Sequence, residues 1–243
     1  GPVVGDEIVA HPGTDAVGFT GSPEVGHHIA QRAAGKPLLL ELGGNGPTVV
    51  LEDIDLDAAA REVAFGSFFN AGQVCSATER ILVHRAVHEE LADRLMAAAR
   101  AVRLGDPFDP ETTMGPLNNV QVAEKMDEHV ADGVAKGAAL LYGGRRRPDL
   151  GSPLFYMPTI LDNVGHDTLL NTEETFGPVA PLMVFDDYDE ALEIANRSNL
   201  GLVSAVFTRD VGKAFRFAEK LRTGIVNVNV HSDYWESHVP FGG

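Results

Sequence analysis

The chain has 243 residues, 44% of them apolar, so it can bury a hydrophobic core as one large domain or two small ones. Nineteen basic residues against 35 acidic ones give a formal net charge of −16, which argues against nucleic acids and anionic membrane surfaces as partners. A single cysteine excludes an internal disulfide, and no apolar stretch reaches about 18 residues, so we expect a soluble protein of the reducing cytoplasm.

The first two predicted strands are short and apolar. DAVGFT (15–20) is partly β-branched, and PLLLEL (37–42) is a near-continuous apolar run of the kind that is buried on both faces of a parallel sheet. Between them, Ser22 can cap a helix that has Pro23 in its first turn. The order strand, helix, strand predicts a parallel pair with a right-handed crossover.

Helix and strand patterns continue to alternate along the rest of the chain. We predict helices near 57–70, 88–102, 119–136, 187–197 and 211–222, and strands near 80–84, 179–185, 203–207 and 224–230. This order is typical of an α/β fold with a mostly parallel sheet and flanking helices. Because GGNGP (43–47) follows an apolar strand and precedes an acidic helix start, we divide the chain into domains of residues 1–42 and 43–243.

Two features near the first strands are candidates for ligand binding. Gly21, Ser22 and Gly26 lie at a strand-to-helix turn, where small residues let backbone N–H groups approach an anion such as pyrophosphate. The spacing is not G-x-G-x-x-G, so an ordinary tight turn is an equally good interpretation. Glu41 interrupts an apolar run at the carboxyl end of a strand, where open α/β sheets bind ligands. It is either a functional carboxylate or a strand-end residue turned to solvent.

The only cysteine lies in FFNAGQVCSATER (68–80), among small and polar residues. Cys75 is either a nucleophile, which needs a nearby base and donors for an oxyanion, or an inert packing residue. Glu174 precedes a Gly-Pro turn and is either a ribose-binding carboxylate or ordinary surface. His84 and His88 have helical spacing, but no third ligand at a recognisable spacing accompanies them, so we predict no metal site.

Five motifs taken together resemble, in the same order, those of the NAD(P)-dependent aldehyde dehydrogenase superfamily. They are FTGSPEVG, LLLELGGNGP, FFNAGQVCSATER, EETFGPV and VPFGG, and they extend over essentially the whole chain. Cys75 follows Glu41 by 34 residues, which is the spacing expected between the base and the nucleophile of that family. Since five ordered signals are far more specific than one, the resemblance favours Cys75 as a nucleophile.

The resemblance implies an aldehyde substrate, NAD or NADP as cofactor, and a role for each matching residue. Cys75 would attack the aldehyde, hydride would pass to the nicotinamide, and Glu41 would activate the water that hydrolyses the thioester. The implied cofactor-binding residues are Gly21, Ser22 and Gly26 at the pyrophosphate, Leu42 at the nicotinamide, and Glu174 and Phe176 at its ribose. The implied substrate-binding residues are Phe69, Ser76, Tyr234, Trp235 and Phe241.

Glu41 also bears on the alternatives within this resemblance. A thioester passed to coenzyme A needs no water-activating carboxylate, so Glu41 favours hydrolysis over a coenzyme A-acylating relative. A noncatalytic structural protein on the same fold would have no reason to keep both Cys75 and Glu41.

Departures from the family pattern affect what the isolated chain can do. Family members are about twice as long, and their oxyanion-hole asparagine, adenosine-ribose residues and final oligomerisation strand have no match here. We therefore expect residues 1–42 to be the C-terminal remnant of a Rossmann-type nucleotide-binding domain, and residues 43–243 to be a catalytic domain truncated at its C-terminal end. The isolated chain should be nearly inactive, and the full-length parent should be an active homodimer or homotetramer.

Overall fold

The computed structural model describes residues 1–243, which divide into two units, Gly1–Gly43 and Gly44–Gly243. The first unit contains α1 (Pro2–Ala10), β1 (Val17–Thr20), α2 (Pro23–Arg32) and β2 (Leu38–Glu41). β1 and β2 pair in parallel, which confirms the predicted strand, helix and strand; α1 has no predicted counterpart. The Ser22 side chain accepts a hydrogen bond from the Val25 N–H at 3.4 Å, as expected for the N-cap of α2.

The burial of β2 differs from the prediction. The apolar run predicted a strand covered on both faces, yet Leu38 is 38% exposed and Leu39 is 66% exposed. The core of this unit contains only three buried residues, Val9, Ile29 and Ala33. Two helices and two strands cannot cover both faces of a sheet, so part of the apolar surface of β2 has no partner within the unit.

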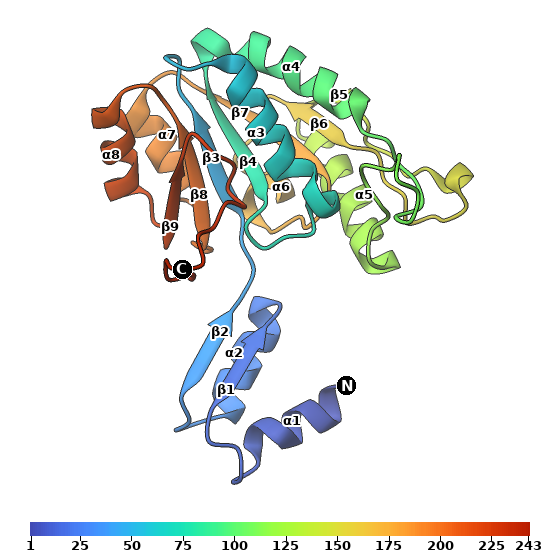
Figure 1. The fold of residues 1–243 in the computed structure, drawn as a ribbon, viewed down its shortest axis with the longest axis vertical. Helices are drawn as coiled ribbons and strands as arrows, with labels where there is room; N and C mark the ends of the chain where they lie inside the picture. Colours follow the sequence, from blue (N-terminus) through green and yellow to red (C-terminus); the bar gives the residue numbers. More distant parts are fainter. The chain divides into compact units, whose positions relative to one another are not determined.

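The second unit is built on a seven-stranded sheet with the order β5-β6-β7-β4-β3-β8-β9 (Figure 1). The strands are β3 (Gly46–Val50), β4 (Thr78–His84), β5 (Ala139–Tyr142), β6 (Thr159–Asp162), β7 (Val179–Phe185), β8 (Val203–Phe207) and β9 (Ile225–Val228). All neighbours are parallel except β5 with β6, so the predicted mostly parallel α/β fold is confirmed. β3, β5 and β6 have no counterpart among the predicted strands.

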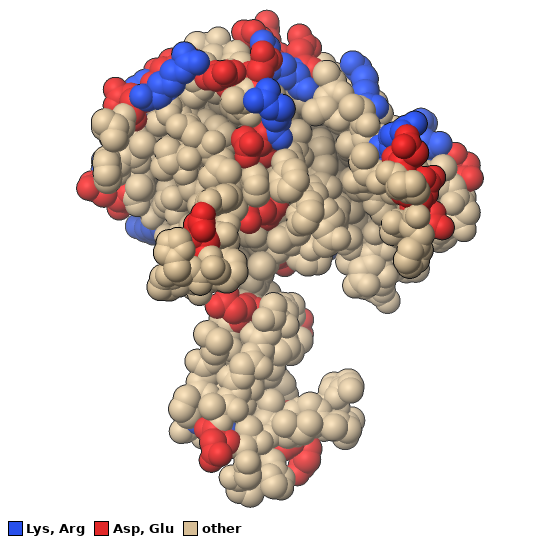
Figure 2. Space-filling view, in the orientation of Figure 1, with Lys and Arg blue, Asp and Glu red and all other residues tan.

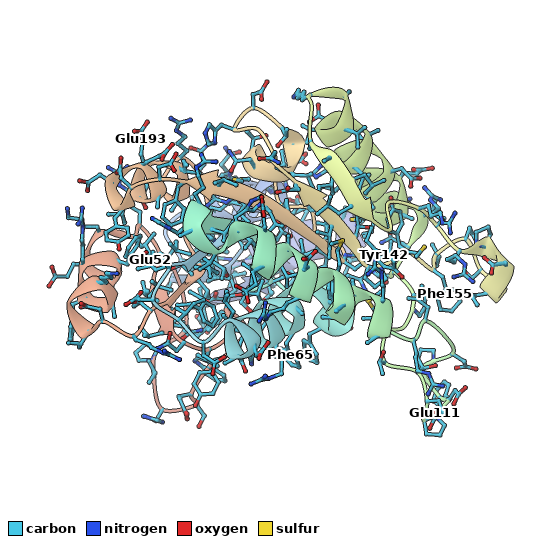
Figure 3. The ribbon with its side chains drawn as sticks, turned by 90° about the horizontal axis from the view of Figure 1, so that it is seen from above. Glu52, Phe65, Glu111, Tyr142, Phe155 and Glu193 are labelled. Atoms are coloured by element: carbon cyan, nitrogen blue, oxygen red, sulfur yellow. The ribbon has the colours of Figure 1, made fainter.

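Helices flank the sheet of the second unit on both faces. They are α3 (Leu56–Phe68), α4 (His88–Ala101), α5 (Val120–Ala135), α6 (Leu169–Thr172), α7 (Tyr188–Ala195) and α8 (Val211–Lys220). Figure 3 shows Phe65 of α3 and Glu193 of α7 on opposite sides of the sheet. Each of the five predicted helices of this unit is present. Four of them have local caps: the side chains of Asp55, Asn119, Asp187 and Asp210 accept hydrogen bonds from the first turns of α3, α5, α7 and α8, whereas α4 has no side-chain cap.

The two edges of this sheet differ in charge. Lys and Arg side chains interleave with Asp and Glu along the edge where the parallel strands end, which lies uppermost in Figures 1 and 2. Ion pairs there include Arg85 with Asp186 and Lys213 with Glu52. The segments that lead into β3, β4 and β7 lie at the opposite, amino-terminal edge, and these segments contain Gly44, Cys75 and Glu174.

Arg80, at the centre of β4, is fully buried without a carboxylate partner. Its guanidinium donates to the backbone oxygens of Asn45, Ile194 and Ala195 at 2.9, 3.1 and 2.9 Å. The last two belong to the final turn of α7, whose carbonyls lack helical partners and carry the negative end of the helix dipole. Burial lowers the pKa of Arg80 to about 10, so it stays charged at neutral pH. Arg80 therefore fastens β4 to α7 and to the segment before β3.

Replacing this cation should strongly destabilise the protein. Arg80→Met removes the guanidinium donors to the buried Asn45 and Ala195 oxygens and one of the two donors to the Ile194 oxygen, which also accepts from the Arg197 N–H at 3.3 Å. We expect it to lower the free energy of unfolding by about 3 kcal/mol. Urea unfolding followed by circular dichroism measures the loss. Arg85→Met, which removes an exposed ion pair with Asp186, is the matched control and should have a much smaller effect. Equal losses for the two variants would contradict the role given to Arg80.

Candidate active site

Cys75 lies in a turn between the 3-10 helix η1 (Phe69–Gly72) and β4. The Ala77 N–H donates to the Val74 oxygen at 3.0 Å and closes this turn. Cys75 itself is partly exposed, whereas Ser76 and Ala77 are buried. The thiol is therefore carried on a turn anchored by its buried C-terminal side, not enclosed in the hydrophobic core.

The backbone before Cys75 is strained. Asn70, Ala71 and Gly72 all have left-handed conformations, with φ of 49°, 57° and 69°. The side chains of Asn70 and Gln73 each donate to the other residue's backbone oxygen, at 3.1 and 3.0 Å. A Cβ on Gly72 would lie 2.1 Å from the Gly177 oxygen, so only glycine fits there. Two sets of contacts thus fix the direction in which the chain enters the Cys75 turn: the hydrogen bonds between Asn70 and Gln73, and the close approach of Gly72 to the segment before β7.

Gly44 lies between Cys75 and Glu174. A Cβ on Gly44 would lie 2.0 Å from the Cys75 oxygen, which shows how closely the two backbones approach. The Gly44 N–H donates to Glu174 Oε1 at 2.9 Å. Burial raises the pKa of the Glu174 carboxyl. Two predicted site residues from distant parts of the sequence are therefore brought to the same glycine.

The loop that carries Glu174 and Phe176 is held by a residue that the sequence analysis missed. The N–H groups of Thr175 and Phe176 donate to the two oxygens of Glu79, at 2.7 and 2.6 Å. Glu79 is 2% exposed, and burial raises its pKa to about 8. The loop is further held by His129, whose Nδ1 lies 3.1 Å from Thr175 Oγ1. Phe176 has a φ of 57°, a conformation that an aromatic residue rarely adopts.

An aromatic group lines the surface beside η1. The rings of Phe65 and Phe69 stack with centroids 5.0 Å apart, and Phe65 also contacts His231 at 4.5 Å. His231 in turn meets the ring of Tyr234 edge-on at 6.2 Å. Phe69 and Tyr234 were predicted, but Phe65 and His231 were not. Phe65 precedes Phe69 by four residues, about one helical turn, and that spacing could have indicated it. Trp235 and Phe241 form a separate edge-on pair at 5.9 Å.

A polar group lies next to the nucleophile turn. Ser76 Oγ donates to Asp233 Oδ1 at 2.8 Å, while Asp233 Oδ2 is buried without a hydrogen-bond partner. Burial raises the pKa of Asp233. The hydroxyls of Thr48, Thr78 and Ser232 form a buried chain with distances of 3.1 and 2.9 Å, which ties this segment to β3 and β4. Ser76, a predicted substrate residue, is therefore already engaged by Asp233.

The remaining predicted residues lie in the first unit, at the carboxyl end of its two strands. Gly21 N–H donates to the Glu41 backbone oxygen at 3.0 Å. A Cβ on Gly26 would lie 2.4 Å from Leu42 Cδ2, so these two residues pack together. Gly21, Ser22, Gly26, Glu41 and Leu42 are thus close to one another in this unit. The roles that would join them to the residues of the second unit remain predictions.

The histidines with helical spacing have other partners. His84 Nδ1 accepts from the Ala86 N–H at 3.3 Å, and His88 Nε2 lies 2.6 Å from Asp162 Oδ1. No group of three or more His, Cys, Asp or Glu side chains is arranged to hold a metal ion. No helix has the length and apolar character needed to cross a membrane.

The backbone of Cys75 and the carboxyl of Glu174 thus meet at Gly44, and the mostly parallel α/β fold that brings them together has its counterpart in a known enzyme family. Residues 1–243 match the profile of the aldehyde dehydrogenase family, and the chain belongs to that family. Vanillin dehydrogenase of Pseudomonas fluorescens is 40% identical over 98% of this chain and 49% of its own length. Betaine aldehyde dehydrogenase of Bacillus subtilis is 39% identical over 100% of this chain and 50% of its own. The chain spans about half the length of the curated relatives it matches.

Solved structures show the same fold. Glyceraldehyde-3-phosphate dehydrogenase from Methanocaldococcus jannaschii, complexed with NADP, superimposes with a TM-score of 0.93 at 38% identity, covering 98% of this chain and 51% of its own. Betaine aldehyde dehydrogenase from Staphylococcus aureus, in complex with NAD+, gives 0.93 at 37% identity, covering 98% and 48%. The predicted family and fold class are thereby confirmed.

The burial of His129 predicts how stability depends on pH. Burial lowers its pKa from 6.5 to about 4, so the unfolded chain binds this proton at a higher pH than the folded protein does. The resulting stability is fully present above pH 6.5 and is lost as the pH falls toward 4, by up to about 3 kcal/mol. His129→Gln should therefore flatten the fall in the free energy of unfolding between these two pH values, as measured by urea unfolding.

His166→Gln provides the control for this measurement, because His166 is exposed in the same unit. The fall in stability between pH 6.5 and 4 should be the same for this variant as for the wild type. A His129→Gln variant whose stability falls as steeply as that of the wild type would show that the imidazole is not kept neutral by burial.

Proposed function

We propose that the full-length protein containing this chain is an NAD(P)-dependent aldehyde dehydrogenase that oxidises an aldehyde to a carboxylic acid. The observation that carries the proposal is the pair of contacts at Gly44. The backbone of Cys75, a partly exposed residue after a strained turn, approaches Gly44 closely, and the half-buried Glu174 accepts a hydrogen bond from the Gly44 N–H. Family membership supports the reaction class. The coarse assignment as an oxidoreductase of aldehydes is common to the relatives named above, as their names state.

The nucleophilic step belongs to Cys75. Its thiolate would attack the aldehyde carbon, and its backbone N–H would hold part of the charge on the resulting oxyanion. NAD or NADP, when bound, accepts the hydride that leaves this carbon. A thioester on Cys75 then remains to be hydrolysed. The fixed entry of the chain into this turn supports the role, because a nucleophile works best when its direction is already set.

Glu41 is proposed as the base that activates the hydrolytic water. It lies at the carboxyl end of β2 and precedes Gly44 by three residues. The base takes a proton from water, which attacks the thioester and releases the acid.

The cofactor-binding residues are proposed in two sets. Glu174 would accept hydrogen bonds from the nicotinamide ribose, since Gly44 occupies only its Oε1 and leaves Oε2 available. Phe176 would pack beside it. In the first unit, Gly21, Ser22 and Gly26 would line the pyrophosphate, where small residues allow close approach, and Leu42 would contact the nicotinamide.

The substrate is proposed to be an apolar or aromatic aldehyde. The stacked rings of Phe65 and Phe69, with His231 and Tyr234, offer flat apolar surfaces close to the segment that leads to Cys75. A relative that is 40% identical is named for an aromatic aldehyde, vanillin. Ser76, Trp235 and Phe241 complete the proposed substrate-binding set.

We further propose a cytoplasmic homodimer or homotetramer. A protein whose reactive group is a thiol benefits from a reducing compartment, which keeps that thiol available. The proposed oligomer follows from family resemblance, and size-exclusion chromatography with light scattering of the full-length protein tests it.

Two variants of the full-length enzyme test the divided roles of thiol and carboxyl. Cys75→Ala should abolish NADH formation from benzaldehyde while the affinity for the cofactor changes less than about twofold, since the thiol acts only in chemistry. Glu41→Gln should keep the first burst of NADH and lose steady turnover by about a hundredfold or more, with an acyl-enzyme detectable by mass spectrometry.

Glu7→Gln, at an exposed position on α1, is the control for changes in charge within the first unit. It should retain both the burst and the steady rate. A Glu41→Gln enzyme with wild-type steady turnover would remove Glu41 from the mechanism. Steady oxidation by Cys75→Ala would overturn the proposed function itself.

A further inference from the structure

Glu79 places a carboxyl group at a buried strand position whose neighbours along the strand are mostly apolar. It lies in β4 just before Ile81, Leu82 and Val83, which are all fully buried, and it is itself 2% exposed. No lysine, arginine or histidine forms an ion pair with it, and successive strand residues point to opposite faces, so Arg80 faces elsewhere. Burying an unpaired carboxyl is costly unless its oxygens are hydrogen-bonded. An apolar side chain at this position would pack in the core without that cost, so the role of Glu79 lies in its hydrogen-bond contacts.

Those contacts are two backbone N–H groups of a single loop. Thr175 donates to Oε2 at 2.7 Å and Phe176 donates to Oε1 at 2.6 Å, so both oxygens are occupied by consecutive residues. Phe176 is the residue of this loop that most needs such support. Its φ of 57° is unfavourable for a residue with a Cβ. The carboxyl compensates for this unfavourable conformation by satisfying both amides at once.

The same loop carries the proposed ribose-binding carboxylate. Glu174 directly precedes the two held residues, and its Oε1 accepts from the Gly44 N–H at 2.9 Å. On the N-terminal side of Glu174, the Asn45 side chain donates to the backbone oxygen of Glu173 at 2.7 Å. Glu79 reaches this loop from β4 and follows Cys75 by four residues, so the position of the loop is tied to the strand that directly follows the nucleophile turn.

We infer that Glu79 is a positioning residue that fixes the Glu174 and Phe176 side chains for the nicotinamide end of the cofactor by holding the amides of Thr175 and Phe176. The cofactor part of this inference rests on the proposed function. Glutamine cannot substitute, because it has the same size but only one acceptor oxygen, so one of the two N–H groups would face an NH₂ donor. Glu79→Gln is therefore a test that leaves no cavity.

The first arm of the test measures the loop itself, without activity. Hydrogen exchange of the 243-residue chain, followed by mass spectrometry on peptides that span 173–178, should become at least about tenfold faster in Glu79→Gln. Glu190→Gln is the matched control, because the exposed Glu190 accepts one backbone N–H, from Asp186 at 2.9 Å, away from the site. It should leave exchange of the loop unchanged. Unchanged exchange in Glu79→Gln would overturn the inference.

The second arm measures the full-length enzyme. Glu79→Gln should raise the KM for NAD(P)+ about tenfold and slow single-turnover hydride transfer by a similar factor, while the KM for the aldehyde and the rate of Cys75 alkylation by iodoacetamide change less than about twofold. If Glu79 had only a structural role, Glu79→Gln would lower the fraction of active enzyme, measured by the size of the NADH burst. The KM of the remaining active enzyme for NAD(P)+ would then be unchanged. That result would overturn the link to the cofactor.

The two arms also separate this inference from the proposed function. If the wild-type full-length protein produces no NADH from aldehydes, the proposed function fails, and the exchange arm still decides whether Glu79 holds the loop. The inference is supported in both parts by three results together: the wild-type enzyme produces NADH, and in Glu79→Gln alone the loop exchanges faster and the cofactor KM rises.

Discussion

The meeting of three chain segments at Gly44 is the constraint on which the site depends. The Cys75 backbone oxygen would lie only 2.0 Å from a Cβ on Gly44, and the Gly44 N–H donates to the Glu174 side chain. Any side chain at this position would push the nucleophile turn away from the segment that leads into β3. The geometry therefore needs glycine for its small size, not for an unusual φ, since Gly44 is not among the glycines with positive φ.

The site of the second unit lies at the amino-terminal edge of its parallel sheet. Open α/β sheets usually bind ligands at the carboxyl ends of their strands, and that edge here carries interleaved charges of both signs. The residues of the first unit follow the usual rule, because Glu41 is the last residue of β2 and Gly21 directly follows β1. Two buried polar side chains next to each other in β4 hold the second unit's edge together: Arg80 fastens it to α7, and Glu79 fastens it to the loop before β7.

Much of this architecture could be predicted from local sequence, and the remainder could not for physical reasons. Helices such as α5 and α7 were predictable because their caps and apolar periodicity are encoded within a few residues. β3 was missed because Gly46 and Pro47 indicate a turn; in the structure, the register shifts between these two residues and pairing resumes. The exposure of β2 depends on how much of a sheet the unit contains, which no local pattern records.

The candidate site shows the same division. Cys75 and Glu174 were found because the family resemblance implies a role for each of them. Glu79 lies in the same motif as Cys75 but was missed, because its partner Thr175 is 96 residues away. A carboxyl in the strand sequence TERILVH was the only available signal, and it does not say what the carboxyl binds.

The most direct test of the central claim is the turnover of the full-length enzyme with Gly44→Ala, measured as steady-state NADH formation from benzaldehyde. A methyl group at 2.0 Å from the Cys75 oxygen requires that backbone to move by an ångström or more, so the account predicts a loss of about a hundredfold with the fold retained by circular dichroism. Wild-type turnover in this variant would show that the contact of Gly44 with Cys75 does not position the nucleophile.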